Sequence, residues 1–420
     1  MSRKLFFRLR VVSSEAMVRL SFYKSTSFFT SARGREKTMK IRVYRKDEPA
    51  FQFGVDYDEY FDGLDWRQAQ VIYDGELEAD KLRKFEFFDR GVELLKTYAY
   101  WISSDEGDEP VGPAAVRIRS PEVWWPYSKI CAHVKALAEN NPALVRVVKV
   151  GATARGRDLE AIYAGNSRKM VALIGSVHPG ESGPEIIIPA LERMINERKD
   201  LLAHIGIAAL PSVGADERER LVQGHPCYLR LNANGVDINR NFDSGWEEMS
   251  DDLGYGLRST DPESMTYRGR APASEPETQA IVDFIRDIPE LSAVFSCHAL
   301  ASICGGALLS AKRSSVDEDY SLRCRQLADW YVAGMYPAEE GGVALPGFSQ
   351  GAYLGVHTDC TPGSLPDWVY ATRKAPAFDM EYDGYEPTKP CMQDLANPEL
   401  MREHQTRHYN ALINVMAHLP

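Results

Sequence analysis

Two histidines and one glutamate follow apolar runs of the sequence closely enough to serve as metal ligands. His178 and Glu181 lie in "VALIGSVHPGESGPE", where an apolar stretch leads into a turn, and His298 ends the apolar run "LSAVFSCH". Imidazole nitrogen and carboxylate oxygen are common zinc ligands, and a catalytic zinc takes three protein ligands and keeps a fourth position for water. The His178–Glu181 spacing alone arises about once by chance in a chain of this composition. Together with His298, it predicts a zinc site with two histidines and one glutamate, as zinc peptidases use.

A polar stretch between these ligands offers groups that could hold a substrate. "YLRLNANGVDINRNF" runs from Tyr228 to Phe242. Arg240 beside Asn239 presents a fork of donors suited to a carboxylate, and Arg230 could stabilise a polarised carbonyl. The alternative is a polar turn that is merely rich in asparagine.

The elements around these residues alternate between strand and helix. Strand patterns occur at "VRVVKVG", "LEAIYAG", "MVALIGSV" and "IGIAALPSV", with helices at "PYSKICAHVKALAEN" and from Pro184 to about Glu197. This order predicts an α/β fold with a mixed, mostly parallel twisted sheet flanked by helices. Sites in such sheets gather at the carboxyl ends of the strands, where His178 and His298 are expected to lie.

The part before this domain has a different composition. "KIRVYR" alternates like a strand, and residues 39–102 predict a small N-terminal domain of the α+β or β type. Residues 103–119 concentrate acid, Gly and Pro, which is typical of a linker. We therefore place the α/β domain at residues 120–420.

Residues 1–38 are basic and rich in Ser and Phe, with nine Lys or Arg against only Glu15 and Glu36. We interpret this segment as a disordered leader or an extension upstream of a start at Met39. A transit peptide is the alternative, because such peptides are basic, rich in Ser and poor in acid.

The overall composition excludes several classes of protein. The chain has 420 residues and a formal net charge of -11, which disfavours a nucleic-acid surface. No stretch approaches the roughly 18 uninterrupted apolar residues of a membrane helix. The seven cysteines are scattered and contain no CxxC pair, so a reducing, cytoplasmic location is expected.

Four motifs, "HPGE", "GVDINRNF", "SCHA" and "APAFDMEY", occur in an order that resembles the M14 family of zinc carboxypeptidases. The resemblance covers roughly Ser120 to Pro420, and "GRDLEAIY" and "SEPET" are similar to framework segments of the family. It implies one bound zinc and a metallocarboxypeptidase activity, that is, a zinc exopeptidase that hydrolyses the C-terminal amide bond of peptides.

The resemblance also implies a role for each motif residue. His178, Glu181 and His298 would bind zinc, and Asp237 would hydrogen-bond a ligand histidine, His178 by preference. Glu381 would act as the general base that takes a proton from the attacking water and delivers it to the leaving amine. Asn239 and Arg240 would hold the substrate's terminal carboxylate. Arg230 would stabilise the oxyanion, although Arg218 and Arg220 lie just upstream of it.

The sequence departs from the family pattern at the mobile-loop tyrosine and between the first two ligands. Thr358 stands at the tyrosine position, His357 or Tyr353 is a candidate to substitute for the tyrosine, and Gly180 replaces the family's common arginine. By the resemblance, Leu365 matches the family residue at the floor of the side-chain pocket, and its apolar side chain disfavours a basic terminal residue.

The motifs leave the substrate open. "HPGE" and the "YLR" spacing are similar to cytosolic carboxypeptidases that trim glutamates from protein tails. "NANGVDINRNF" and "TPGSLPDW" are similar to bacterial amidases that cut γ-D-glutamyl-diaminopimelate bonds in murein peptides. The expected partner is thus a peptide or protein C-terminal tail, or a murein peptide.

Two other functions remain as alternatives. "GFSQG" satisfies the GxSxG pattern of serine hydrolases, with Ser349 as nucleophile and Asp367 and His404 or His408 following in the required order. This motif requires a strand before the serine and a helix after it, and the flanking sequence favours neither. The second alternative is a zinc-binding module without catalytic turnover.

Overall fold

The computed structural model divides into two compact units. The first contains Met1–Trp124 and Arg220–Cys227, and the second contains Trp125–Glu219 and Tyr228–Pro420. The residues that the structure describes are 6–14, 17–24, 38–47, 57–80, 84–104, 109–165, 168–181, 183–253, 258–298, 307–335, 356–381 and 398–419.

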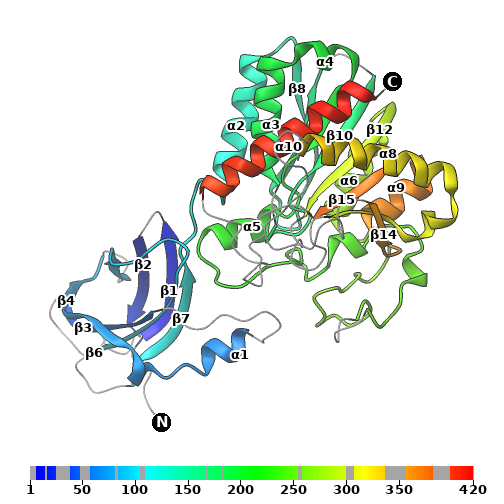
Figure 1. Ribbon diagram of the computed structural model, residues 1–420. Coiled ribbons are helices and arrows are strands. Elements are labelled where there is room, and N and C mark those ends of the chain that lie inside the picture. Colours follow the sequence, from blue (N-terminus) through cyan, green and yellow to red (C-terminus); the bar gives the residue numbers. More distant parts are fainter. Residues whose placement is uncertain are drawn as a thin grey trace. The chain divides into compact units, whose positions relative to one another are not determined.

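The first unit contains two antiparallel sheets, coloured blue to cyan in Figure 1. One has the order β1-β2-β5, with β1 (Phe6–Ser14), β2 (Met17–Lys24) and β5 (Lys84–Asp89). The other has the order β4-β3-β6-β7, with β4 (Gln70–Glu78), β3 (Thr38–Asp47), β6 (Thr97–Ser104) and β7 (Val111–Arg117). Helix α1 (Tyr57–Asp62) and the short η2 (Trp66–Gln68) complete the described elements.

The core of this unit joins its two sheets. Val18, Leu20 and Phe22 alternate along β2 and are fully buried in one cluster with Ile41 of β3 and Tyr100 of β6. Full burial of such a side chain stabilises the fold by roughly 1.5–3 kcal/mol.

The strands of this unit extend into segments for which the sequence predicted other roles. Strands β1 and β2 lie within residues 1–38, where a leader was expected, and β7 lies within the expected linker 103–119. The physical reason is the period-two apolar pattern of β2, because burial against the second sheet outweighs the basic composition of the segment. Residues 220–227 belong to this unit although they are distant in sequence.

The second unit is built on a mixed sheet with eight described strands in the order β14-β13-β15-β12-β10-β11-β9-β8. The three strands β10, β11 and β12 and their neighbour β15 run parallel, whereas β8 and β9 pair antiparallel at one edge. The expected mixed, mostly parallel sheet is confirmed. The strands are β8 (Val145–Ala152), β9 (Asp158–Ala164), β10 (Lys169–Ile174), β11 (Gly206–Leu210), β12 (Glu290–His298), β13 (Ala307–Ala311), β14 (Val356–Cys360) and β15 (Ala377–Glu381).

Helices cover both faces of this sheet (Figure 1). On one face, Ala172 of β10 is buried in a cluster with Ile281 of α6 and Trp368 of α9. On the other face, Leu173 lines a small cavity with side chains of α3, α8 and α10. The described helices after residue 124 are α2 (Tyr127–Asn140), α3 (Pro184–Glu197), α4 (Lys199–His204), α5 (Ala215–Val222), α6 (Pro276–Arg286), α8 (Glu318–Met335), α9 (Leu365–Arg373) and α10 (Pro398–His418), with the short 3-10 helices η3 (Ile238–Arg240), η4 (Trp246–Glu248) and η5 (Lys312–Val316). The end of α5, from Arg220, belongs to the first unit.

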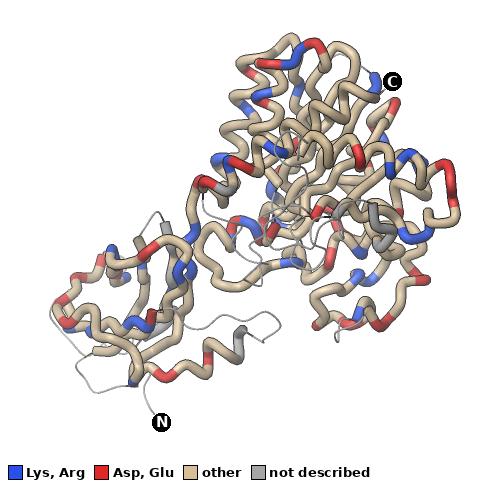
Figure 2. Tube along the Cα trace, viewed as in Figure 1, with Lys and Arg blue, Asp and Glu red and all other residues tan. Residues whose placement is uncertain are grey.

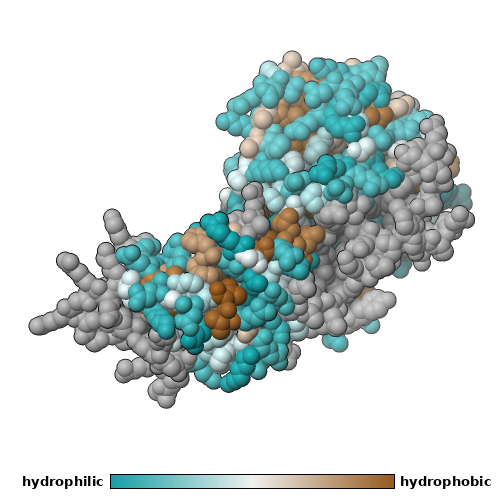
Figure 3. Space-filling model, turned by 60° about the vertical axis from the view of Figure 1, so that its left-hand side comes forward, coloured by the Kyte–Doolittle hydropathy of each residue, from teal (hydrophilic) through white to brown (hydrophobic). Residues whose placement is uncertain are grey.

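Charged residues of both signs are distributed along the described chain. Acidic and basic residues are interspersed along the chain in Figure 2, and hydrophilic residues predominate over the described part of the face shown in Figure 3. Among the described residues, no helix combines the length and apolar content required to cross a bilayer.

Candidate metal centre

Two neighbouring parallel strands bring the three predicted ligands to one edge of the sheet. Strand β10 pairs with β12 so that Ile174 lies opposite Ser296, and both strands end at this edge. His298 is the last residue of β12, and His178 lies in the turn that follows β10. Glu181 ends this turn shortly before α3, and its backbone N–H donates to the carbonyl of His178 at 3.1 Å.

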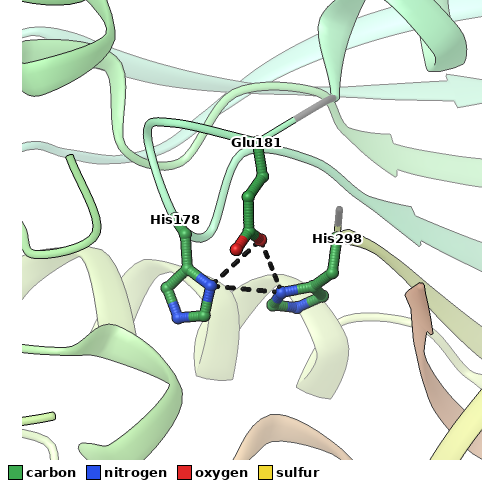
Figure 4. Close-up of side chains that lie close together, drawn as sticks. All are labelled: His178, Glu181 and His298. Carbon is green, nitrogen blue, oxygen red and sulfur yellow. Dashed lines mark hydrogen bonds and ion pairs between the residues drawn. The ribbon is translucent and has the colours of Figure 1, made fainter. Parts of the chain in front are cut away.

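The three side chains converge on one point (Figure 4). Oε2 of Glu181 lies 3.0 Å from Nδ1 of His178 and 2.8 Å from Nδ1 of His298, and the two nitrogens are 3.2 Å apart. All three residues are at most 1% exposed. Burial alone would raise the pKa of Glu181, but the two histidines outweigh it and hold that pKa well below its ordinary value. The site thus favours an ionised carboxylate between two imidazoles.

Asp237 supports His178 from the side away from this point. Its Oδ1 lies 3.0 Å from Nε2 of His178, and its Oδ2 accepts from Nε of Arg230 at 2.8 Å. Burial alone would raise the pKa of Asp237, but Arg230 and His178 hold it well below its usual range. An ionised Asp237 fixes the His178 tautomer that carries its proton on Nε2 and leaves the Nδ1 lone pair facing the site.

His298 has a comparable carboxylate partner that the sequence motifs did not single out. Oδ1 of Asp379 lies 3.2 Å from Nε2 of His298, which also lies 3.1 Å from the hydroxyl of Ser296. Burial alone would lower the pKa of His298, but Asp379 and Glu181 raise it well above its ordinary value. The sequence could have indicated Asp379. It stands two residues before Glu381, and alternate residues of a strand share one face, so both carboxylates are expected on the same face.

Glu381 lies beside the ligands because of the strand order. It is the last residue of β15, and the pairing of β15 with β12 sets it opposite His298. Its exposure is 3%. The predicted base is thus carried to the ligand edge by a neighbouring parallel strand.

Asn239 and Arg240 form part of the turn η3. The Asn239 amide donates from Nδ2 to Oδ2 of Asp379 at 2.7 Å and accepts at Oδ1 from the backbone N–H of Leu365 at 2.9 Å. Arg240 donates from Nη1 to the carbonyl of Asn239 at 2.8 Å, and among the described residues its buried Nε has no hydrogen-bond partner. Asn239 therefore connects the predicted carboxylate-binding turn to Asp379 and so to His298.

Two further residues support the turn that carries His178 and Glu181, and the sequence motifs assigned this role to neither of them. The hydroxyl of Tyr228 donates to Oε1 of Glu181 at 2.6 Å. Burial, followed by the charge of Glu181, raises the pKa of Tyr228 well above its ordinary value. Arg218, considered above for the oxyanion, instead donates to the carbonyls of Pro179 and Glu181 at 3.2 and 2.6 Å.

The structure describes only part of the serine-hydrolase alternative, namely Asp367, His404 and His408. Ser349, with the whole of "GFSQG", falls outside the described residues. Asp367 accepts from Arg313 and from Ser244 at 2.6 Å, and His408 pairs with the hydroxyl of Tyr331. These contacts differ from the aspartate–histidine pair of a catalytic triad.

The predicted substitute for the mobile-loop tyrosine has no described side chain. Tyr353 lies outside the described residues, and His357 and Thr358 belong to strand β14. Substitution of that tyrosine by Tyr353 or His357 stays a prediction.

A buried set of two histidines and one glutamate, at the carboxyl edge of a mixed α/β sheet, is an arrangement that zinc-dependent hydrolases use. A sequence model described as zinc carboxypeptidase, Peptidase M14, matches residues 130–394. The chain belongs to this family, whose members bind zinc.

Similar proteins of known function match shorter regions. Rat carboxypeptidase B is 29% identical over 202 residues, which cover 42% of this chain and 45% of that protein. Rat carboxypeptidase A1 is 39% identical over 69 residues, which cover 16% of this chain and 15% of that protein. The chain therefore spans less than half the length of these two relatives in alignment.

Solved structures show the same fold. Carboxypeptidase A from Helicoverpa armigera has a TM-score of 0.53 at 16% identity. This alignment covers 91% of the present chain and 98% of the chain in that structure. Bovine thrombin-activatable fibrinolysis inhibitor has a TM-score of 0.52 at 20% identity. That alignment covers 71% of the present chain and 98% of the chain in the solved structure.

Proposed function

We propose that the protein is a zinc-dependent exopeptidase that hydrolyses the C-terminal amide bond of peptides. The observation that carries the proposal is the buried convergence of His178, Glu181 and His298 beside Glu381. Membership of the zinc carboxypeptidase family supports the reaction class.

The three ligand side chains fit a zinc ion by their chemistry. Each histidine has one nitrogen toward a carboxylate, Asp237 or Asp379, and the other toward the common point. Such carboxylate–histidine pairs orient imidazoles that bind zinc and raise their basicity. When bound, zinc lowers the pKa of water and polarises the scissile carbonyl.

We assign the proton transfers to Glu381. A carboxylate at the ligand edge can accept the proton of the attacking water and then deliver it to the leaving amine. The register of β15 against β12 supports this role because it sets Glu381 opposite the ligand His298.

We assign substrate recognition to the turn η3 and to Arg230. The Asn239 amide uses one N–H for Asp379, so the second N–H would be offered to the terminal carboxylate. The Arg240 guanidinium, whose Nε lacks a partner among the described residues, would supply the opposite charge. Arg230 is anchored through Nε on Asp237, and its remaining N–H groups would stabilise the negative charge that develops on the carbonyl oxygen.

A cleavage screen tests the proposal. Zinc-loaded protein is incubated with ordinary peptides, polyglutamylated tails and murein peptides, and the products are analysed by mass spectrometry. Release of one terminal residue, abolished by a zinc chelator, is expected. The proposal fails if no substrate is cleaved, or if cleavage survives the chelator and is blocked by a fluorophosphonate, which would point to Ser349.

The same screen identifies the substrate. Cleavage of polyglutamylated tails alone would indicate a tail-trimming enzyme. Cleavage of the γ-D-glutamyl-diaminopimelate bond alone would indicate a murein peptide amidase on the same fold.

A further inference from the structure

Tyr228 gives the two carboxylate oxygens of Glu181 different partners. Its hydroxyl donates to Oε1 at 2.6 Å, whereas Oε2 faces Nδ1 of His178 at 3.0 Å and Nδ1 of His298 at 2.8 Å. A short hydrogen bond to an ionised carboxylate is among the stronger hydrogen bonds in proteins. Glu181 is therefore held in one rotational position, with a single oxygen toward the histidines.

The ring of Tyr228 is held in place by the turn that it supports. A Cβ atom on Gly180 would lie 2.4 Å from Cδ2 of Tyr228 and 2.9 Å from the carbonyl oxygen of Leu229. The backbone N–H of Gly180 donates to that same carbonyl at 2.7 Å. Glycine is thus required at position 180 because the aromatic ring takes the space of a side chain, which explains the missing arginine.

We propose that Tyr228 is a positioning residue that holds Oε1 of Glu181, so that Glu181 would offer a metal ion Oε2 alone. This inference rests on the proposed metal site. Catalytic zinc needs an open coordination position for water, and a carboxylate that binds through one oxygen leaves more room for it than one that binds through two. Gly180 and Tyr228 form a matched pair, since any side chain at position 180 displaces the ring and its hydroxyl.

The experiment compares Tyr228→Phe with the unchanged protein, using the full chain. Zinc affinity is measured by chelator competition, and the visible spectrum is recorded after cobalt(II) replaces zinc. Loss of a hydrogen bond to a metal ligand typically weakens metal affinity about 10–100-fold. We expect Tyr228→Phe to bind zinc about tenfold more weakly and to show a changed cobalt spectrum, because Oε1 of Glu181 is released.

Tyr409→Phe is the matched control. It removes another tyrosine–glutamate hydrogen bond, from Tyr409 to Glu197 at 2.8 Å, in helices α10 and α3. It should leave both readouts unchanged. An unchanged cobalt spectrum in Tyr228→Phe, with zinc affinity within about twofold of the wild type, would overturn the inference.

Gly180→Ala provides a second, independent perturbation. It should weaken zinc binding by displacing the hydroxyl, and Tyr228→Phe should then add little in the Gly180→Ala background. If the effects of the two substitutions on zinc affinity are fully additive, Gly180 and Tyr228 do not act as a pair. Melting temperatures of the metal-free variants separate this effect from general loss of folding.

The two proposals fail in distinguishable ways. If the protein binds zinc but cleaves no member of the substrate panel, the proposed function is wrong. The role of Tyr228 can then still be measured by the cobalt spectrum and the zinc affinity. A wild-type protein that binds no zinc overturns both.

Discussion

Glu381 lies directly across from His298 in the parallel pairing of β15 with β12. The residue proposed as general base and a proposed zinc ligand therefore hold their relative position through backbone hydrogen bonds of the sheet. Sites built on strands keep their geometry better than sites built on loops. This pairing makes the role of Glu381 testable without disturbing the metal ligands.

Glu381→Gln should abolish most of the hydrolysis and keep the zinc. Glutamine preserves the size of the side chain but cannot accept the proton of water, and general acid–base catalysis contributes about 10²–10⁴-fold to rates. The measurements are kcat on the best peptide and zinc content by elemental analysis. Wild-type hydrolysis by a zinc-loaded variant would show that the assigned base is wrong.

Asp379→Asn should affect both metal and substrate. The Asp379 carboxylate faces His298 at 3.2 Å and accepts from Asn239 at 2.7 Å, so the substitution disturbs two connected parts of the site. We expect zinc affinity to fall by about tenfold or more. We also expect KM to rise, because an asparagine side chain has one acceptor oxygen where the carboxylate has two, one for His298 and one for Asn239. Chelator competition and steady-state kinetics measure the two effects, and an unchanged KM would show that Asn239 holds its position without Asp379.

Arg240→Ala should weaken recognition of the terminal carboxylate. Hydrogen bonds to charged groups contribute about 1.5–3 kcal/mol, so kcat/KM on peptides with a free carboxylate should fall by about tenfold or more. A peptide with an amidated C-terminus is the matched control substrate, because it lacks the charge that Arg240 would bind. The wild type should prefer the free acid strongly, and the variant should lose most of this preference. Equal losses on both substrates would argue against a carboxylate contact.

Asp237→Asn should destabilise the metal-free protein in a pH-dependent manner. Asp237 is fully buried between Arg230 and His178, and removing one partner of a buried ion pair costs about 3–5 kcal/mol. Because its folded-state pKa is depressed, its contribution is present above the unfolded-state pKa of about 3.9 and is lost as pH falls toward the folded-state value. Urea unfolding of both proteins in chelator should show a large difference at neutral pH that shrinks below about pH 4. A difference that is constant with pH would exclude an ionised Asp237 as its cause.

The sequence alone predicted the three residues of the candidate metal site and their place in the fold. His178 and His298 each follow an apolar run, and parallel strands end at a common edge, so their convergence could be expected from local pattern and the general rule for α/β sheets. The spacing of Glu181 from His178 alone is no better than chance, and Glu181 became a candidate ligand only together with His298 and the family motifs. Glu381 was reached only through the family motif "FDMEY", since a glutamate that ends a short apolar strand is most often a solvated surface residue.

The sequence motifs predicted Asp237 as a support for His178, but only the tertiary structure decided the roles of Asp379 and Tyr228. Asp379 meets His298 because β15 lies next to β12, although the two strands are far apart in the sequence. Tyr228 meets Glu181 because its segment packs against the turn at Gly180. The same holds for β1 and β2, whose burial depends on a second sheet of the first unit. Candidate ligands can be predicted from side-chain chemistry and local sequence pattern. The residues that hydrogen-bond to those ligands depend on strand order and on close packing between distant segments, which periodicity and spacing do not encode.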